Sequence, residues 1–189
     1  MPRIISDENR IKRFRKRWYG YYQTKVDGKY EWRHINWDLH ERRAIGVLSG
    51  KETTYDQNGS PRGYDLEGGL RDSRIVMFTK AIESDEPCGV IVMPFMAEAF
   101  HSVNCGVQFH RTWDGNNSVS PIIISPDPIK EVEEVGPIKD SKKIQFLRQL
   151  WESKFEKLNE VLPNVKIAKE SLPPIVKEGA QAELRFNNE

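Results

Sequence analysis

Histidine and cysteine are the side chains in this sequence best suited to catalysis or metal binding. The two cysteines, Cys88 and Cys105, lack the paired spacing of a zinc site. The chain contains no phosphate-binding loop, no Gly-Xaa-Ser-Xaa-Gly turn and no His-Glu-Xaa-Xaa-His motif. The residues therefore predict no catalytic centre, no metal site and no cofactor, and we expect that the protein is not an enzyme. The histidines, which are scattered along the chain, are His34, His40, His101 and His110.

Tryptophan and tyrosine are concentrated between residues 18 and 37, and their rings are the best candidates for binding chemistry. Because side chains alternate between the two faces of a strand, Trp32 and His34 share one face there, while Arg33 and Trp37 share the other. An aromatic ring therefore points inward in either register. Such rings, with an arginine or histidine, suit a small planar or anionic ligand such as a nucleotide. Ordinary packing is the alternative for each ring.

The residues predicted to face a ligand are chosen by strand position and chemistry. A one-residue shift in register would exchange about half of them for their neighbours. They are Tyr22, Trp32, His34, Tyr64, Arg74, Gln108 and His110.

Eight short segments with strand-forming residues must position these side chains. Turn residues separate them, most clearly Asp27-Gly28, and no helical pattern intervenes. This order predicts an antiparallel meander, and closing it buries its edges. We therefore expect a mainly β protein with a closed eight-stranded up-and-down barrel, whose interior is filled by side chains or holds one small ligand. The predicted strands are 18–24, 30–39, 44–49, 63–68, 74–82, 89–95, 104–112 and 119–125.

Segments outside the barrel complete the predicted organisation. Residues 1–17 form a short basic helix, 18–126 the barrel, 127–139 a linker without periodicity, and 140–189 a C-terminal helix and tail. Apolar residues at three- and four-residue steps predict an amphipathic helix over 140–158. Its apolar face either packs on the barrel or serves a homodimer or protein partner.

The overall charge limits the classes of partner. The 29 Lys and Arg nearly balance the 28 Asp and Glu, for a net charge of +1, so the totals do not indicate a surface for long nucleic acids. No stretch reaches the roughly 18 apolar residues that span a bilayer, and the N-terminus lacks a signal-peptide core. We expect a cytoplasmic protein with no transmembrane segment.

Short pieces of residues 18–126 resemble a known small barrel. They include Trp18-Tyr-Gly-Tyr-Tyr22, Tyr64-Asp-Leu-Glu-Gly68, Gly106-Val-Gln-Phe-His110 and Ser120-Pro-Ile-Ile-Ile-Ser125. Together they look like the lipocalin-like β-barrel of the membrane-tethered effectors in bacterial cyclic-oligonucleotide anti-phage signalling (CBASS). The resemblance implies a cyclic-nucleotide ligand and a role in bacterial or phage immunity. This chain shows no transmembrane helices before the barrel, so the resemblance implies a sensor or a protein that sequesters the signal.

Three functions follow from these observations. The first is a small-ligand-binding barrel, which includes the cyclic-nucleotide sensor. The second is a protein-interaction barrel that acts through its terminal helices, and the third is a small barrel cyclase or isomerase. A buried acid or base with a shifted pKa inside an open barrel would favour the third over the first.

Overall fold

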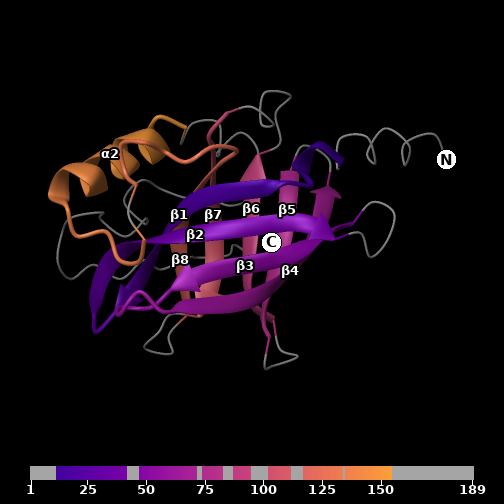
Figure 1. Cartoon of the computed structure of the whole chain (residues 1–189), viewed down its shortest axis with the longest axis horizontal. Coiled ribbons are helices and arrows are strands. Elements are labelled where there is room, and N and C mark those ends of the chain that lie inside the picture. Colours follow the sequence, from indigo (N-terminus) through magenta and orange to yellow (C-terminus); the bar gives the residue numbers. More distant parts are fainter. Residues whose placement is uncertain are drawn as a thin grey trace, which may run out of the picture.

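Every strand pairs antiparallel with its neighbours in sequence, and β1 also pairs with β8, so the sheet closes on itself (Figure 1). The computed structural model describes residues 12–41, 47–71, 74–82, 87–94, 102–111, 117–133 and 135–154. The predicted closed, eight-stranded antiparallel barrel is confirmed. Its strands are β1 (Arg17–Val26), β2 (Lys29–Glu41), β3 (Leu48–Tyr55), β4 (Pro61–Arg71), β5 (Arg74–Ala81), β6 (Pro87–Pro94), β7 (Asn104–Arg111) and β8 (Asn117–Ser125).

The third strand lies further along the chain than the sequence predicted. It was expected at 44–49 but runs over Leu48–Tyr55. Two of its inward positions are polar, Glu52 and Thr54, so the segment lacks the apolar alternation by which a strand is recognised. The strand was placed too early because its inward-facing side chains are polar, whereas the sequence pattern of a strand expects apolar side chains there.

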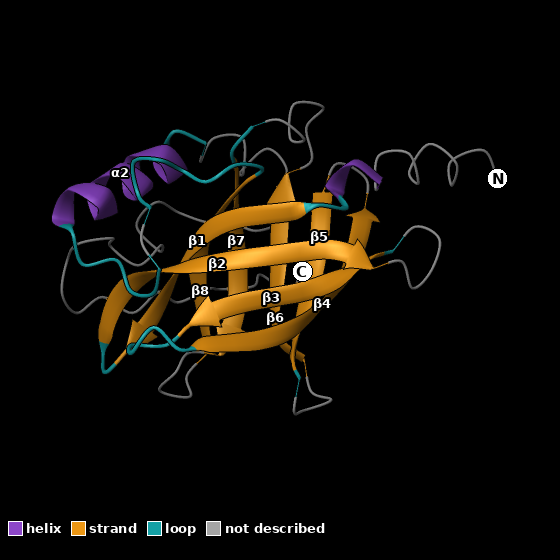
Figure 2. Cartoon of the chain, viewed as in Figure 1, coloured by secondary structure: helices purple, strands orange, loops and turns teal. Residues whose placement is uncertain are grey.

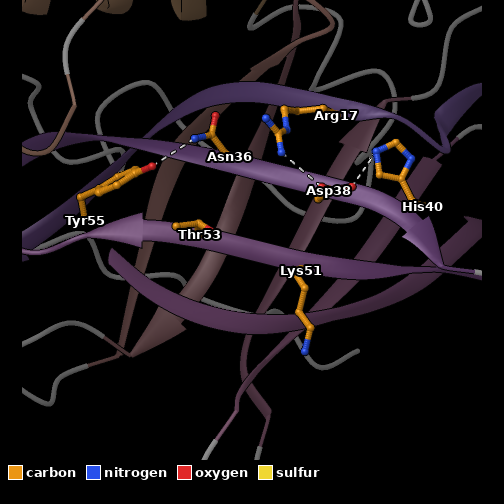
Figure 3. Close-up of a pocket in the computed structure, with 7 residues that line it drawn as sticks. All are labelled: Arg17, Asn36, Asp38, His40, Lys51, Thr53 and Tyr55. Atoms are coloured by element: carbon orange, nitrogen blue, oxygen red, sulfur yellow. Dashed lines mark hydrogen bonds and ion pairs between the residues drawn. The ribbon is translucent and has the colours of Figure 1, made fainter. Parts of the chain in front are cut away.

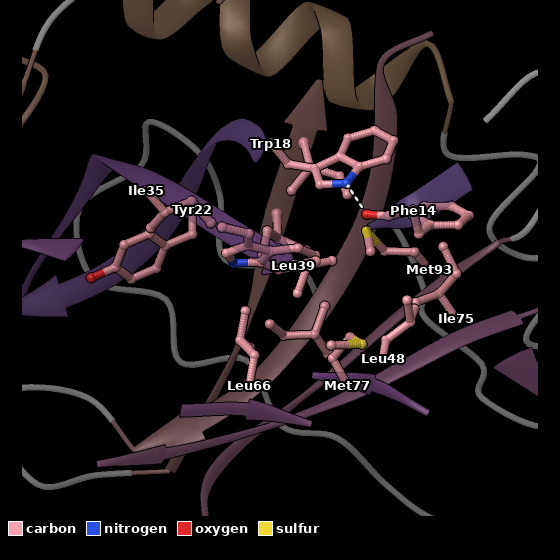
Figure 4. Packing of buried hydrophobic residues seen from close by; sticks show 14 residues of the cluster. Phe14, Trp18, Tyr22, Ile35, Leu39, Leu48, Leu66, Ile75, Met77 and Met93 are labelled. Atoms are coloured by element: carbon pink, nitrogen blue, oxygen red, sulfur yellow. Dashed lines mark hydrogen bonds between the residues drawn. The ribbon is translucent and has the colours of Figure 1, made fainter. Parts of the chain in front are cut away.

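One half of the barrel interior is filled by apolar side chains (Figure 4). Phe14, in a helical turn over residues 12–14, closes this end of the barrel by stacking on Trp18, with ring centroids 5.1 Å apart. The indole of Trp18 also donates a hydrogen bond to the carbonyl of Phe14 at 2.9 Å. Tyr22 lies at the opposite edge of the cluster, with its hydroxyl pointing away from it. The rest of the cluster is Ile35, Trp37, Leu39, Leu48, Leu66, Ile75, Met77, Ile91, Met93, Ile122 and Ile124.

Helix α2 (Ser141–Glu152) packs on the outside of the barrel wall beside β7 and β8 (Figure 2). Asp140 caps its N-terminus, since its carboxylate accepts hydrogen bonds from the backbone of the first turn. Leu147 and Trp151 are buried against the wall, and Trp151 Nε1 donates to the carbonyl of Gly106 at 2.9 Å. These two side chains are therefore unavailable to a partner. The helix ends at Glu152, before the predicted end at residue 158, and residues 153–154 form a turn. The predicted helical residues 155–158 and residues 1–11 lie outside the described part of the chain.

Residues 127–139, predicted as a linker, pack closely on the barrel wall in their described part. Ile129, Val132 and Ile138 are buried in the same outer cluster as Trp151. The amide of Ile138 donates to the carbonyl of Trp32 at 2.8 Å, and a β-bridge joins Arg33 to Pro137. The segment thus covers the outer face of β2 instead of separating the barrel from α2.

The two cysteines are free thiols that face opposite sides of the wall. Cys105 is buried outside the barrel, near the carbonyl of Leu150. Cys88 lies beside Thr79 on the inner side, with 3.4 Å between Sγ and Oγ1. A disulfide between them is excluded by this arrangement.

No helix in the described part of the chain is long and apolar enough to cross a membrane.

Candidate ligand site in the barrel interior

Polar side chains line the half of the barrel interior that the apolar cluster does not fill. Thr24, Arg33, Tyr64, Thr79 and Ser120 face inward because a residue two positions away on the same strand belongs to the apolar cluster. Glu52, Thr54 and Gln108 pair with the inward-facing Trp37, Ile35 and Ile91, His110 follows Gln108 by two residues, and Cys88 lies beside Thr79. All eight strands contribute to this set, which we call the polar half. Its members are Tyr22, Thr24, Arg33, Glu52, Thr54, Tyr64, Thr79, Cys88, Gln108, His110 and Ser120.

Glu52 lies where the polar half meets the apolar cluster. Its register partners are Trp37 on β2 and Tyr64 on β4, and only 4% of its surface is exposed. Trp37 Nε1 donates a hydrogen bond to Glu52 Oε2 at 2.8 Å. Burial raises the pKa of Glu52 to about 7, and the hydrogen bond from Trp37 opposes that shift. The site therefore holds a carboxyl group that changes charge near neutral pH.

His110 lies on the other side of the interior and is uncharged near neutral pH. Its Nε2 is 3.1 Å from the hydroxyl of Ser120, and its ring meets Tyr22 edge-on, with centroids 6.2 Å apart. Burial lowers the pKa of His110 to about 4. The imidazole can thus donate or accept a hydrogen bond without adding a positive charge.

Arg33 brings a guanidinium group into the polar half, but that charge already has a partner. Its side chain is buried, and it forms an ion pair with Glu31. It also donates to the carbonyl of Tyr55 at 3.2 Å. The guanidinium is thereby held by the protein's own groups.

Two buried oxygen atoms near Ser120 have no hydrogen-bond partner within the described structure. They are Oε1 of Gln108 and Oγ1 of Thr24. Gln108 pairs directly with Ser120, and Tyr22, two residues before Thr24, pairs with Ile122. A buried acceptor without a partner costs about 1 to 3 kcal/mol. These atoms are therefore well placed to meet donors of a bound molecule.

Tyr64 and Cys88 add two neutral groups near Glu52. Burial raises the pKa of the Tyr64 phenol, and the negative charge of Glu52 raises it further. Burial also raises the pKa of the Cys88 thiol, with a smaller contribution of the same sign from Glu52. Both groups are protonated at neutral pH and can act as hydrogen-bond donors.

Four of the seven sequence-predicted residues point into the polar half and three do not. Tyr22, Tyr64, Gln108 and His110 are together inside. Trp32, His34 and Arg74 lie on the outer face: Trp32 is covered by residues 129–138, His34 stacks on Tyr55, and Arg74 precedes the inward-facing Ile75.

The outward placement on β2 has a simple cause in the register. Tyr22 pairs with Arg33, so the odd-numbered residues of β2 face inward and the even-numbered ones face outward. Sequence reasoning also missed the other members of the polar half, which are Thr24, Arg33, Glu52, Thr54, Thr79, Cys88 and Ser120. Polar residues at 52 and 54 alternate along β3 as they would on a strand face exposed to solvent. The pairing of β3 with β2 shows that they face the interior instead.

A hollow of about 480 Å³ lies on the outer wall over β1, β2 and β3 (Figure 3). Its charged groups are paired within the wall. Asp38 lies 3.4 Å from Arg17 and 2.7 Å from His40, and Lys51 lies 2.7 Å from Asp65. The hollow therefore offers no uncompensated charge to a ligand and is the weaker candidate. Its lining residues are Arg17, Asn36, Asp38, His40, Lys51, Thr53 and Tyr55.

Comparison with protein-family models, with curated proteins and with solved structures finds no significant match to this chain. Within the described ranges, no three histidine, cysteine or acidic side chains come together as a metal site.

Proposed function

We propose that this chain is a small-ligand-binding barrel and that the ligand occupies the polar half of its interior. The observation that carries the proposal is the burial, within the polar half, of hydrogen-bonding groups without a partner: Oε1 of Gln108 and Oγ1 of Thr24 and Thr54. A natural core satisfies nearly all such groups. A ligand that supplies donors to these atoms would remove their cost.

The test uses Gln108→Leu and the melting temperature. Leucine has a similar size and no acceptor, so the unliganded variant should be more stable than the wild type by about 1 to 2 kcal/mol. A ligand that binds only the folded state raises the melting temperature. We expect a screen of small molecules, including cyclic and linear nucleotides, to contain compounds that stabilise the wild type and stabilise Gln108→Leu much less.

Gln145→Leu, on the exposed face of α2, is the matched control. It makes the same chemical change away from the barrel interior and should respond to ligands as the wild type does. Equal ligand-induced stabilisation of the wild type and Gln108→Leu would place the binding elsewhere. Failure of every compound to stabilise the wild type would refute the proposal.

A cyclic nucleotide, and with it a role in anti-phage signalling in the cytoplasm, stays a prediction from the resemblance. Phosphate groups require cations or backbone donors. Arg33 reaches the polar half but is already in an ion pair with Glu31. Including cyclic dinucleotides in the same screen tests this ligand class directly.

Glu52 favours a second candidate function, a proton-transferring enzyme such as a cyclase or isomerase. A general acid or base works best when its pKa is near the operating pH, and the pKa of Glu52 is raised to about 7. Each stabilising compound should therefore be incubated with the protein and recovered. A changed compound whose formation stops in Glu52→Gln would support an enzyme, whereas unchanged recovery of every compound would support binding alone.

A further inference from the structure

The chemistry around Glu52 indicates which class of ligand the polar half accepts. We propose that it binds a small protonated amine, with the carboxylate of Glu52 as the counter-ion of the ammonium group. This inference rests on the proposed function and names the ligand class of the same site.

The carboxyl group of Glu52 is held in a defined orientation. Trp37 Nε1 donates to Oε2 from one side, and Tyr64 is the register partner on the other. Trp37 is itself a buried member of the apolar cluster, so it cannot swing away without opening that core. One oxygen of Glu52 is thus fixed by the protein, and the group acts as an oriented acceptor.

The titratable groups around Glu52 do not neutralise it. On β4 and β6, Tyr64 and Cys88 are neutral because their pKa values are raised. On β7, the pKa of His110 is lowered to about 4, so the imidazole is neutral too. On β2, the guanidinium of Arg33 is paired with Glu31. Arg62, two residues before Tyr64 on β4, is exposed and lies 4.0 Å from Asp56. Among the described residues, no cation forms a hydrogen bond or an ion pair with Glu52.

The polar half holds further acceptors that the donors of an ammonium group could use. The ammonium group carries three donors. Glu52 can accept one of them, and Oε1 of Gln108 and Oγ1 of Thr24 are buried acceptors without a partner. The rings of Tyr22 and Tyr64 face the same interior, and aromatic faces attract organic cations.

Other ligand classes fit these groups less well. An anion would meet the negative charge of Glu52, and its attraction to Arg33 would compete with the existing pair to Glu31. A neutral ligand would leave the ionised carboxylate without a counter-charge in a buried site, which is costly, so Glu52 would stay protonated beside it. A cation is the class of ligand that stabilises the ionised form of Glu52.

The test compares three probes of similar size that differ in charge: 2-phenylethylamine, 2-phenylethanol and 3-phenylpropionate. Binding is measured by isothermal titration calorimetry and by melting temperature near neutral to mildly alkaline pH. We expect the amine to bind most tightly and Glu52→Gln to weaken amine binding about thirtyfold or more, while changing the affinity for the alcohol little. Glu67→Gln removes an acid from the exposed outer face of β4 and is the matched control.

A pH series on the wild type provides a second measurement that does not depend on a variant. Amine affinity should increase as pH rises through about 7, because the carboxylate form of Glu52 binds the ammonium group. Glu52→Gln should abolish that dependence.

Three results would overturn the inference in different ways. If the alcohol, the propionate or a nucleotide stabilises the wild type in a Gln108-dependent manner and the amine does not, the amine class is wrong and the binding function stands. If no probe and no screened compound binds, both the amine inference and the proposed binding function are wrong. Equal amine binding by the wild type and Glu52→Gln would also overturn the role of Glu52.

Discussion

At the scale of single residues, Glu52 makes stability depend on pH. Its pKa is about 7 in the folded chain, against 4.5 for the ordinary side chain. Between these values the folded state binds more protons than the unfolded state, so the stability that this group contributes below pH 4.5 is lost as pH rises to 7. The loss amounts to about 3 kcal/mol.

Glu52→Gln should therefore stabilise the protein at alkaline pH only. We expect its free energy of unfolding to match the wild type near pH 4.5 and to exceed it by about 3 kcal/mol near pH 8. Urea unfolding at the two pH values measures the difference. A stabilisation of equal size at both pH values would show that removal of the negative charge is not the cause.

His110 produces the opposite dependence. Its pKa falls from 6.5 to about 4 on folding, so the unfolded state binds more protons between these values and stability rises with pH across that window. In the wild type this rise partly cancels the fall due to Glu52. Replacing His110 with Gln, which can still hydrogen-bond to Ser120, should remove about 3 kcal/mol of the rise. Unfolding curves measured from mildly acidic to neutral pH test this. If the free energy of unfolding depends on pH in the same way in the variant and the wild type, the prediction is wrong.

At the scale of elements, Trp151 makes the main contact that holds α2 on the barrel. Trp151 is about 1% exposed and bonds to the carbonyl of Gly106. Trp151→Phe should cost about 1 to 2 kcal/mol, mainly the lost hydrogen bond, whereas Trp151→Ala should cost about 3 to 5 kcal/mol by leaving a cavity. Gln149→Ala, on the exposed face of α2, should change stability by less than about 0.5 kcal/mol. Chemical unfolding measures all three, and similar values for Ala and Phe would argue against tight packing.

At the scale of the whole molecule, closure determines which backbone groups exchange with water. Pairing of β1 with β8 leaves the barrel without an edge strand. Peptides that cover Tyr19–Tyr22 and Ile122–Ser125 should therefore exchange their amide hydrogens as slowly as peptides from β4 and β5 in the middle of the sequence order. Hydrogen exchange with mass spectrometry measures this. Faster exchange confined to β1 and β8 would show a barrel that opens along that seam.

The sequence by itself determined the class of fold. Aromatic and β-branched segments separated by turn residues specify antiparallel strands, and eight of them in a row favour closure, because any open sheet would leave two unpaired edges. The amphipathic stripe of α2 likewise follows from local spacing, confirmed over Ser141–Glu152. These features depend on residues close together in the chain, and so they can be recognised in the sequence.

Only the tertiary structure decided which side chains share the interior. A strand has two faces, and pairing of Tyr22 with Arg33 assigns Trp32 and His34 to the outside. The same pairing, carried through Trp37, turns Glu52 inward although its neighbours in sequence are polar. Strand register depends on contacts between residues far apart in the chain, and a shift of one residue reverses every assignment. Glu52 was therefore not recognised from the sequence, because its segment has the local pattern of a polar surface.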